Sequence, residues 1–196
     1  MEVSRSHRAR NLFYSLDACL WSRRGFRSPP PERFKMSLVK SYSDLGYRAF
    51  VETGTRYGDM LLAMVESFDH LWSIEMDPTL HRLASDRLAP YRNVEIHLGD
   101  SGSLLSTVLT RLRVPAVFWL DAHPGEDEPG AVPLLKEVCT ILEHDIGNHV
   151  ILIDDTRLLS GHNGWPSLEQ VDDYLRSSGR VRGIGHANNI FRVDLT

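Results

Sequence analysis

The stretch Arg48–Gly58, RAFVETGTRYG, places a short apolar strand directly before a turn that contains two glycines. The residues that follow, Asp59–Phe68, carry apolar side chains at helical spacing. A strand, a glycine turn and a helix in direct succession are typical of an α/β fold. The stretch therefore predicts a first βα unit, with a turn between its two elements that a ligand can approach.

The same alternation of strand and helix continues along the chain. Five βα units are followed by two short strands around the turn Ala187-Asn188, which read as an antiparallel hairpin. Strands that are apolar on both faces indicate a parallel sheet with helices on each side. The expected helices are Phe34–Leu45, Asp59–Phe68, Pro78–Leu88, Leu104–Leu112, Val132–His144 and Leu168–Arg176, and the expected strands are Arg48–Glu52, His70–Glu75, Val94–Leu98, Ala116–Leu120, Val150–Ile153, Val181–His186 and Asn189–Val193.

Length and charge indicate one domain with an appendage. The chain has 196 residues, and its net charge of −4 lacks the basic footprint of a nucleic-acid-binding protein, so no nucleic-acid partner is expected. Residues 1–35 hold eight Lys/Arg against three Asp/Glu. A basic N-terminal arm, residues 1–33, is therefore expected to precede an acidic domain, residues 34–196.

The apolar runs and the cysteine content of the chain are those expected of a cytoplasmic protein. No apolar run reaches the roughly 18 residues of a transmembrane helix, so no membrane span is expected. Asp17 interrupts the apolar residues of the arm, which argues against a secretory signal. Two cysteines, Cys19 and Cys139, do not make a disulfide framework.

Acidic or glycine residues stand at the carboxyl ends of all five parallel strands, where open α/β sheets bind ligands. Gly54 and Gly58 would let a ligand approach the backbone after the first strand, and Glu52 would attract a cationic or amino-bearing ligand. Glu75 follows about 20 residues after the turn, the usual place for a carboxylate that binds ribose hydroxyls. Asp100 suits an adenine amino group or, alternatively, the N-cap of the next helix, a role for which Ser101 competes.

Five motifs stand in order at the ends of these strands: VETGTRYG (Val51–Gly58), IEMD (Ile74–Asp77), LGDS (Leu98–Ser101), FWLDAH (Phe118–His123) and ILIDDTR (Ile151–Arg157). Together they resemble the ordered motifs of class I S-adenosylmethionine-dependent methyltransferases, in particular small bacterial proteins with VETGT and FWLD-G/A-H signatures. The resemblance spans about residues 34–194 and implies a doubly wound, seven-stranded, mostly parallel sheet whose last strand is antiparallel.

The resemblance also implies that S-adenosylmethionine lies along the strand ends, with Glu75 on the ribose and Met76 beside the adenine. The expected cofactor-binding residues are Glu52, Thr53, Gly54, Thr55, Gly58, Glu75, Met76, Asp100 and Ser101.

A second group, Asp121, His123, Asp154 and Asp155, follows the fourth and fifth strands. Clustered carboxylates suit Mg²⁺, with Mn²⁺ or Ca²⁺ as alternatives, and similar metal-dependent O-methyltransferases place ligands where Asp121, Asp154 and Asp155 stand. His123 or Asp121 is the candidate catalytic base. In the alternative without metal, Asp154 caps the following segment and Asp155 pairs with Arg157.

The expected function is methyl transfer from S-adenosylmethionine to a hydroxyl oxygen of a small molecule, such as a natural product, a sugar or a catechol-like compound, with help from a divalent metal. A non-catalytic cofactor-binding or assembly protein remains an alternative, because fold does not give function, and so does a metal-dependent oxygenase or hydrolase. Apolar residues in Asn11–Trp21 lie near helical spacing, so the arm is expected to dock, as a lid or on a partner subunit of a homo-oligomer, with binding to a membrane surface as the alternative.

Overall fold

The structure is a computed structural model that describes residues 29–123 and 132–196, together with Trp21 and Arg23. The expected role of the basic arm therefore falls largely outside the described residues. Trp21 of the arm is described, and its ring lies 5.0 Å from the ring of Phe34, centroid to centroid.

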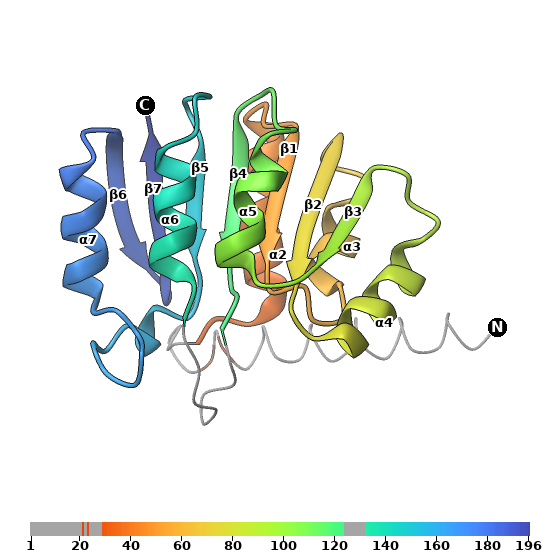
Figure 1. Cartoon of the computed structure of the whole chain (residues 1–196), viewed down its shortest axis with the longest axis horizontal. Coiled ribbons are helices and arrows are strands. Elements are labelled where there is room, and N and C mark those ends of the chain that lie inside the picture. The colour runs from red at the N-terminus through yellow and green to blue at the C-terminus, as the bar shows by residue number, and fades with distance from the viewer. Residues whose placement is uncertain (1–20, 22, 24–28, 124–131) are drawn as a thin grey trace.

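The core of the molecule is a seven-stranded sheet with the order β3-β2-β1-β4-β5-β7-β6 (Figure 1). Strands β1 to β5 run parallel, whereas β7 is antiparallel to both of its neighbours, β5 and β6. This confirms the predicted doubly wound sheet with an antiparallel last strand. The strands are β1 (Ala49–Thr53), β2 (His70–Glu75), β3 (Val94–Leu98), β4 (Ala116–Leu120), β5 (Val150–Ile153), β6 (Val181–Ala187) and β7 (Ile190–Leu195).

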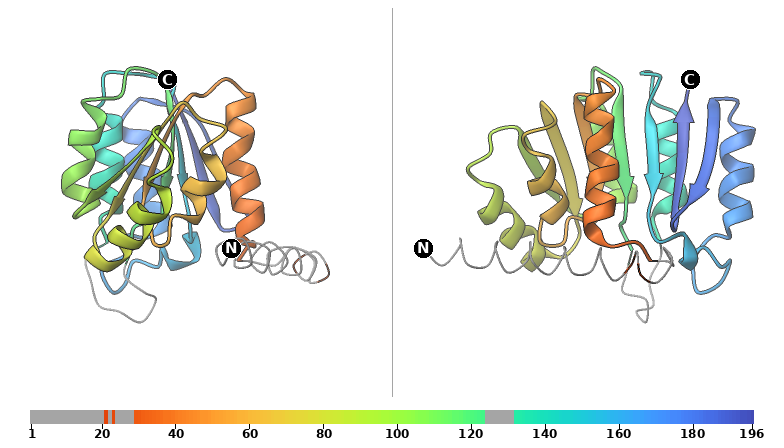
Figure 2. Two further views of the ribbon diagram at one scale, coloured as in Figure 1. Left: turned by 90° about the vertical axis from the view of Figure 1, so that its right-hand side faces the viewer. Right: turned by 180° about the vertical axis from the view of Figure 1, so that it is seen from behind.

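Helices cover both faces of the sheet (Figure 2). Alternate residues of β1 serve the two faces: Val51 belongs to the core under α5, α6 and α7, and Phe50 belongs to the core under α2, α3 and α4. This division explains why the central strands are apolar on both faces. The helices are α2 (Glu32–Asp44), α3 (Asp59–Met64), α4 (Pro78–Leu88), α5 (Ser101–Leu109), α6 (Leu134–Leu142) and α7 (Leu168–Ser177).

Helix α5 begins three residues earlier than its apolar spacing predicts. Asp100 is its N-cap: the carboxylate accepts the N–H of Gly102 at 3.2 Å and the hydroxyl of Ser103 at 2.6 Å. A side chain that satisfies the free N–H groups of the first turn fixes where a helix starts. Among the described residues, none of the helices has the length and apolar character needed to cross a membrane.

Candidate functional site

The carboxyl ends of the parallel strands meet at one edge of the sheet, the lower edge in Figure 1. Backbone hydrogen bonds continue past the strands at this edge. The N–H of Asp121 donates to the carbonyl of Thr53 at 3.1 Å, and the N–H of Asp154 donates to the carbonyl of Leu120 at 3.1 Å. The turns after β1, β4 and β5 therefore lie side by side, and they bring the two groups of predicted residues together.

The turn after β1 requires both of its glycines. Gly54 has a φ of +84°, and a Cβ there would lie 2.5 Å from the carbonyl oxygen of Asp121. Gly58 has a φ of +71° at the N-cap of α3, and a Cβ there would lie 2.8 Å from Leu88 Cδ1. Only glycine adopts this backbone at such close approach without strain. The two glycines thus let the turn pack closely against the turn after β4 and against α4.

Glu52 is buried at the end of β1 and is held by a chain of hydroxyl groups. The Ser73 hydroxyl donates to Glu52 Oε2 at 2.8 Å, so the Thr55 hydroxyl, 2.6 Å from Ser73 Oγ, donates in turn to Ser73. Burial raises the pKa of Glu52 well above its ordinary value, and the nearby carboxylates of Asp121 and Glu75 act in the same direction. A cationic group placed beside Glu52 would therefore favour its ionised form.

Glu75 fixes the conformation of two neighbouring turns. Its carboxylate accepts the N–H of Arg56 at 2.7 Å through Oε2 and the N–H of Asp77 at 2.9 Å through Oε1. Each carboxylate oxygen keeps a second lone pair, so Glu75 can still accept hydroxyl hydrogen bonds. Next to it, the Met76 side chain is 70% exposed and offers an apolar surface at the same edge.

The remaining predicted cofactor residues lie along the same edge. Thr53 is the last residue of β1 and is fully buried, and Thr55 is buried in the glycine turn. Asp100 caps α5 as described above, and Ser101 is the buried first residue of that helix. Asp100 therefore has the N-cap role that was the alternative to an adenine contact. Its carboxylate still lies at the edge of the sheet.

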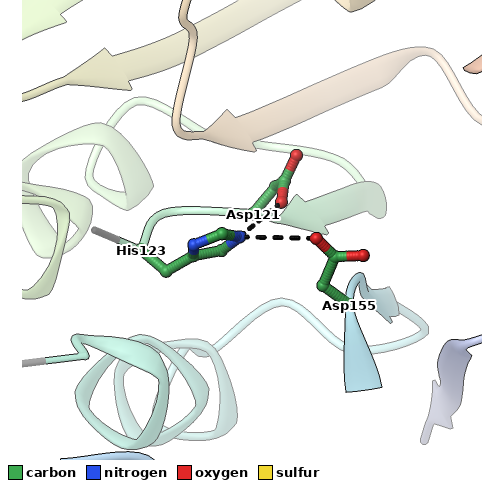
Figure 3. Close-up of side chains that lie close together, drawn as sticks. All are labelled: Asp121, His123 and Asp155. Carbon is green, nitrogen blue, oxygen red and sulfur yellow. Dashed lines mark ion pairs between the residues drawn. The ribbon is translucent and has the colours of Figure 1, made fainter. Parts of the chain in front are cut away.

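Asp121, His123 and Asp155 form a cluster at the ends of β4 and β5 (Figure 3). His123 Nε2 lies 3.4 Å from Asp121 Oδ1 and 3.6 Å from Asp155 Oδ2. One ligand atom from each residue lies within 4.8 Å of the other two, a spacing at which the three could hold a metal ion. Two carboxylate oxygens and one imidazole nitrogen suit a small divalent cation.

Asp155 is held in place by several partners. The Asn189 amide donates to Asp155 Oδ1 at 3.0 Å, and Arg157 forms an ion pair with the same oxygen. Burial opposes ionisation, but the hydrogen bond from His123 and the charges of Lys35 and Arg157 hold the pKa of Asp155 at about 2. Its backbone adopts a φ of +48°, a conformation that costs a non-glycine residue free energy and recurs at functional sites. The carboxylate is therefore ionised and oriented before any ligand arrives.

Asp154 has a different partner, which the motifs did not reveal. Lys35 of α2 lies 2.6 Å from Asp154 Oδ2, and both side chains are buried. Burial alone would lower the pKa of Lys35, but Asp154 and Glu32 raise it above its ordinary value and keep the ammonium charged. The signal for Lys35 was its position on α2, four residues before buried Val39, which puts a lysine on the apolar face of that helix.

One residue of the loop between β5 and α7 also reaches the cluster. The ring of Trp165 lies 5.1 Å from the ring of His123, centroid to centroid, in a tilted arrangement. Trp165 ends the segment Leu158–Trp165, whose residues favour contacts with a sugar or an aromatic ring. The acidic segment Pro124–Gly130 also follows the site directly, but it lies outside the described residues.

No family model and no curated protein sequence matches the chain. Solved structures do match. The O-methyltransferase TomG from Streptomyces achromogenes, involved in tomaymycin synthesis and solved with SAM, has a TM-score of 0.63 at 17% identity, covering 93% of this chain and 88% of that one. An O-methyltransferase from Bacillus cereus, solved with SAH, has a TM-score of 0.61 at 11% identity, covering 93% and 90%.

A third match contains a metal. The MycE methyltransferase of the mycinamycin pathway, solved with Mg, SAH and mycinamycin VI, has a TM-score of 0.59 at 12% identity, covering 83% of this chain and 48% of that one. These identities are too low to transfer an activity, but the shared architecture extends over most of the chain. The chain has the fold of the class I S-adenosylmethionine-dependent methyltransferases.

Proposed function

We propose that this chain is an S-adenosylmethionine-dependent methyltransferase that methylates a hydroxyl oxygen of a small molecule, with a divalent ion held by Asp121 and Asp155. One observation carries the proposal: the glycine turn after β1 packs against the backbone of Asp121, so the proposed cofactor edge and the carboxylate cluster are contiguous. A methyl donor and an acceptor oxygen need this proximity, because orienting the reactants supplies much of the rate.

The residues of the turn fit a cationic nucleoside. Glu52 offers a buried carboxyl to the positive amino acid end of the cofactor, and Glu75 offers its free lone pairs to the ribose. Met76 supplies an apolar contact for the adenine, and Asp100 an acceptor for its amino group. TomG was solved with SAM, which supports the same cofactor for this fold.

The cluster fits the acceptor side of the reaction. A divalent ion, when bound, supplies a Lewis acid that lowers the pKa of a coordinated hydroxyl. His123 is the base that we assign, because its imidazole lies beside the two carboxylates that would hold the ion and hence beside a hydroxyl bound to that ion, and Asp121 is the second candidate. Trp165, packed near His123, provides an aromatic wall that favours an acceptor with a ring, such as a sugar or a catechol.

Calorimetry with the intact chain tests both halves of the site. We expect S-adenosylmethionine and its demethylated product to bind, and Mg²⁺ to bind separately at the cluster. Asp155→Asn should lose the Mg²⁺ signal and keep nucleotide binding, whereas Asp172→Asn, a control in α7 outside the cluster, should keep both. Absence of nucleotide binding at millimolar concentration would refute the methyltransferase assignment.

Turnover is tested on a panel of sugar, catechol and other hydroxyl-bearing acceptors. We expect product from at least one class, and at least about a hundredfold loss of rate in His123→Asn if its imidazole takes the proton. Nucleotide binding without turnover on any acceptor would instead favour the non-catalytic binding protein.

A further inference from the structure

Lys35 enters the functional site from a part of the chain that the motifs do not include. It lies in the first turn of α2, whose N-terminal end reaches the lower edge of the sheet in the rear view of Figure 2. Its ammonium lies 2.6 Å from Asp154 Oδ2 and 3.1 Å from Glu32 Oε1. The Lys35 side chain is 8% exposed and the Asp154 side chain is 0% exposed, so this ion pair is shielded from water.

Both oxygens of Asp154 are occupied by groups of the chain itself. Oδ2 takes the Lys35 ammonium, and Oδ1 accepts the N–H of Asp155 at 2.8 Å. Asp121 and Asp155, in contrast, keep oxygens directed at the space around His123. Asp154 therefore lies next to the cluster without contributing to it.

The charges explain why a lysine is needed at this place. The carboxylates of Glu32, Asp121, Asp154 and Asp155 gather around one end of the sheet, and Lys35 is the cation that contacts the most deeply buried of them. A buried carboxylate without a cation is strongly destabilising, and an ammonium of the same chain is present at all times, whereas a dissolved ion binds only at sufficient concentration.

We propose that Lys35 is the resident cation of this site: its ammonium occupies the place at Asp154 that a divalent ion would otherwise take, which limits the site to one ion, at Asp121 and Asp155. Lys35 is thus a positioning residue: it holds the Asp154 carboxylate in place, and that carboxylate in turn holds the backbone N–H of Asp155, when no metal is bound. The inference deepens the proposed function, but its test involves neither cofactor nor acceptor, so a failure of methyl transfer would leave it intact.

The test compares the thermal unfolding of the full chain in EDTA, in MgCl₂ and in CaCl₂. We expect Lys35→Gln to lower the unfolding temperature in EDTA by roughly 10 °C, because it leaves a buried carboxylate unpaired. We expect millimolar Mg²⁺ or Ca²⁺ to restore at least half of this loss, and to shift the wild type by much less. Lys40→Gln removes an exposed positive charge from the same helix and should behave like the wild type.

If Lys35→Gln does not fold in EDTA, a double variant provides the test. Lys35→Gln with Asp154→Asn removes both charges of the pair, so it should fold in EDTA and show only the ion response of the wild type. The inference is overturned if divalent ions stabilise Lys35→Gln no more than the wild type. It is equally overturned if the double variant fails to fold, or gains as much stability from ions as the single variant.

Discussion

We expect the buried carboxyl of Glu52 to link binding of the proposed cofactor to the release of a proton. Burial raises the pKa of this carboxyl, so it is protonated in the free protein at pH values at which an exposed glutamate is ionised. S-adenosylmethionine, bound at this turn as we propose, would bring positive charge there and favour the carboxylate. We therefore expect binding to release a proton and to tighten with rising pH, by up to about tenfold per pH unit below the raised pKa.

Proton release can be measured by calorimetry in two buffers that differ in ionisation enthalpy. The apparent binding enthalpy of the wild type should depend on the buffer, and that of Glu52→Gln, which has the same shape but no titratable proton, should depend on it much less. Equal buffer dependence in both proteins would mean that the proton comes from another group.

For single residues, the sequence predicts site residues that follow a strand better than site residues that lie inside a strand or a helix. Asp121 and Asp155 follow apolar strands, so the geometry of a parallel sheet was enough to predict that they meet. Ser73 lies inside β2, and it reaches Glu52 because the two residues are paired in the β1–β2 register. Lys35 contacts Asp154, which lies 119 residues later in the sequence. Neither contact can be inferred without knowing how the elements pack.

The turn between β1 and α3 depends on a close backbone contact. We expect Gly54→Ala to destabilise the protein by roughly 2 kcal/mol or more and to abolish cofactor binding, because the new methyl group would meet the Asp121 carbonyl at 2.5 Å. Gly46→Ala is a matched control. Gly46 also has a positive φ, +96°, but no atom lies within 4 Å of the methyl position, so only the cost of the backbone conformation, about 1 kcal/mol, remains.

Urea unfolding of the two variants separates the free-energy cost of the contact with Asp121 from the cost of the backbone conformation. A loss of stability in Gly54→Ala that is no larger than in Gly46→Ala would show that the turn can move away from Asp121.

Elements were predicted better in their interiors than at their ends. The spacing of Leu105 and Leu109 predicted α5, but its first residue is set by the capping carboxylate of Asp100, which is local chemistry without periodicity. In α3 the predicted helix ran to Phe68, whereas the helix ends at Met64 and the following turn lets Phe68 pack beside Phe50, ring centroids 5.5 Å apart. Packing against one face of the sheet decides where such a helix ends, and the spacing of apolar residues does not reveal it.

The molecule as a whole has a second buried polar system, at the sheet edge opposite the site. The N–H of Ala116 donates to His149 Nδ1 at 3.0 Å, so His149 carries its proton on Nε2 and donates to His144 Nδ1, also at 3.0 Å. His144 Nε2 in turn donates to the carbonyl of Leu109 at 3.1 Å. This chain of neutral histidines joins the start of β4, the start of β5 and the end of α5, which are far apart in the sequence.

The histidine chain makes global stability depend on pH. Burial, with smaller effects from His144 and Arg180, lowers the pKa of His149 to about 4, whereas an unfolded histidine has a pKa of about 6.5. Between these values the unfolded chain binds the additional proton, so the stabilisation is present above about pH 6.5 and is lost as the pH falls towards 4. The shift corresponds to about 3 kcal/mol from His149.

Urea unfolding at about pH 7.5 and about pH 5 isolates this contribution as a difference between two proteins. Over this interval the wild type should lose roughly 2 kcal/mol relative to His149→Gln, because buried carboxyls with a raised pKa, such as Glu52, act equally in both. His70→Gln, which removes an exposed histidine, should retain the loss, and a pH dependence in His149→Gln equal to that of the wild type would contradict this role of the histidine chain.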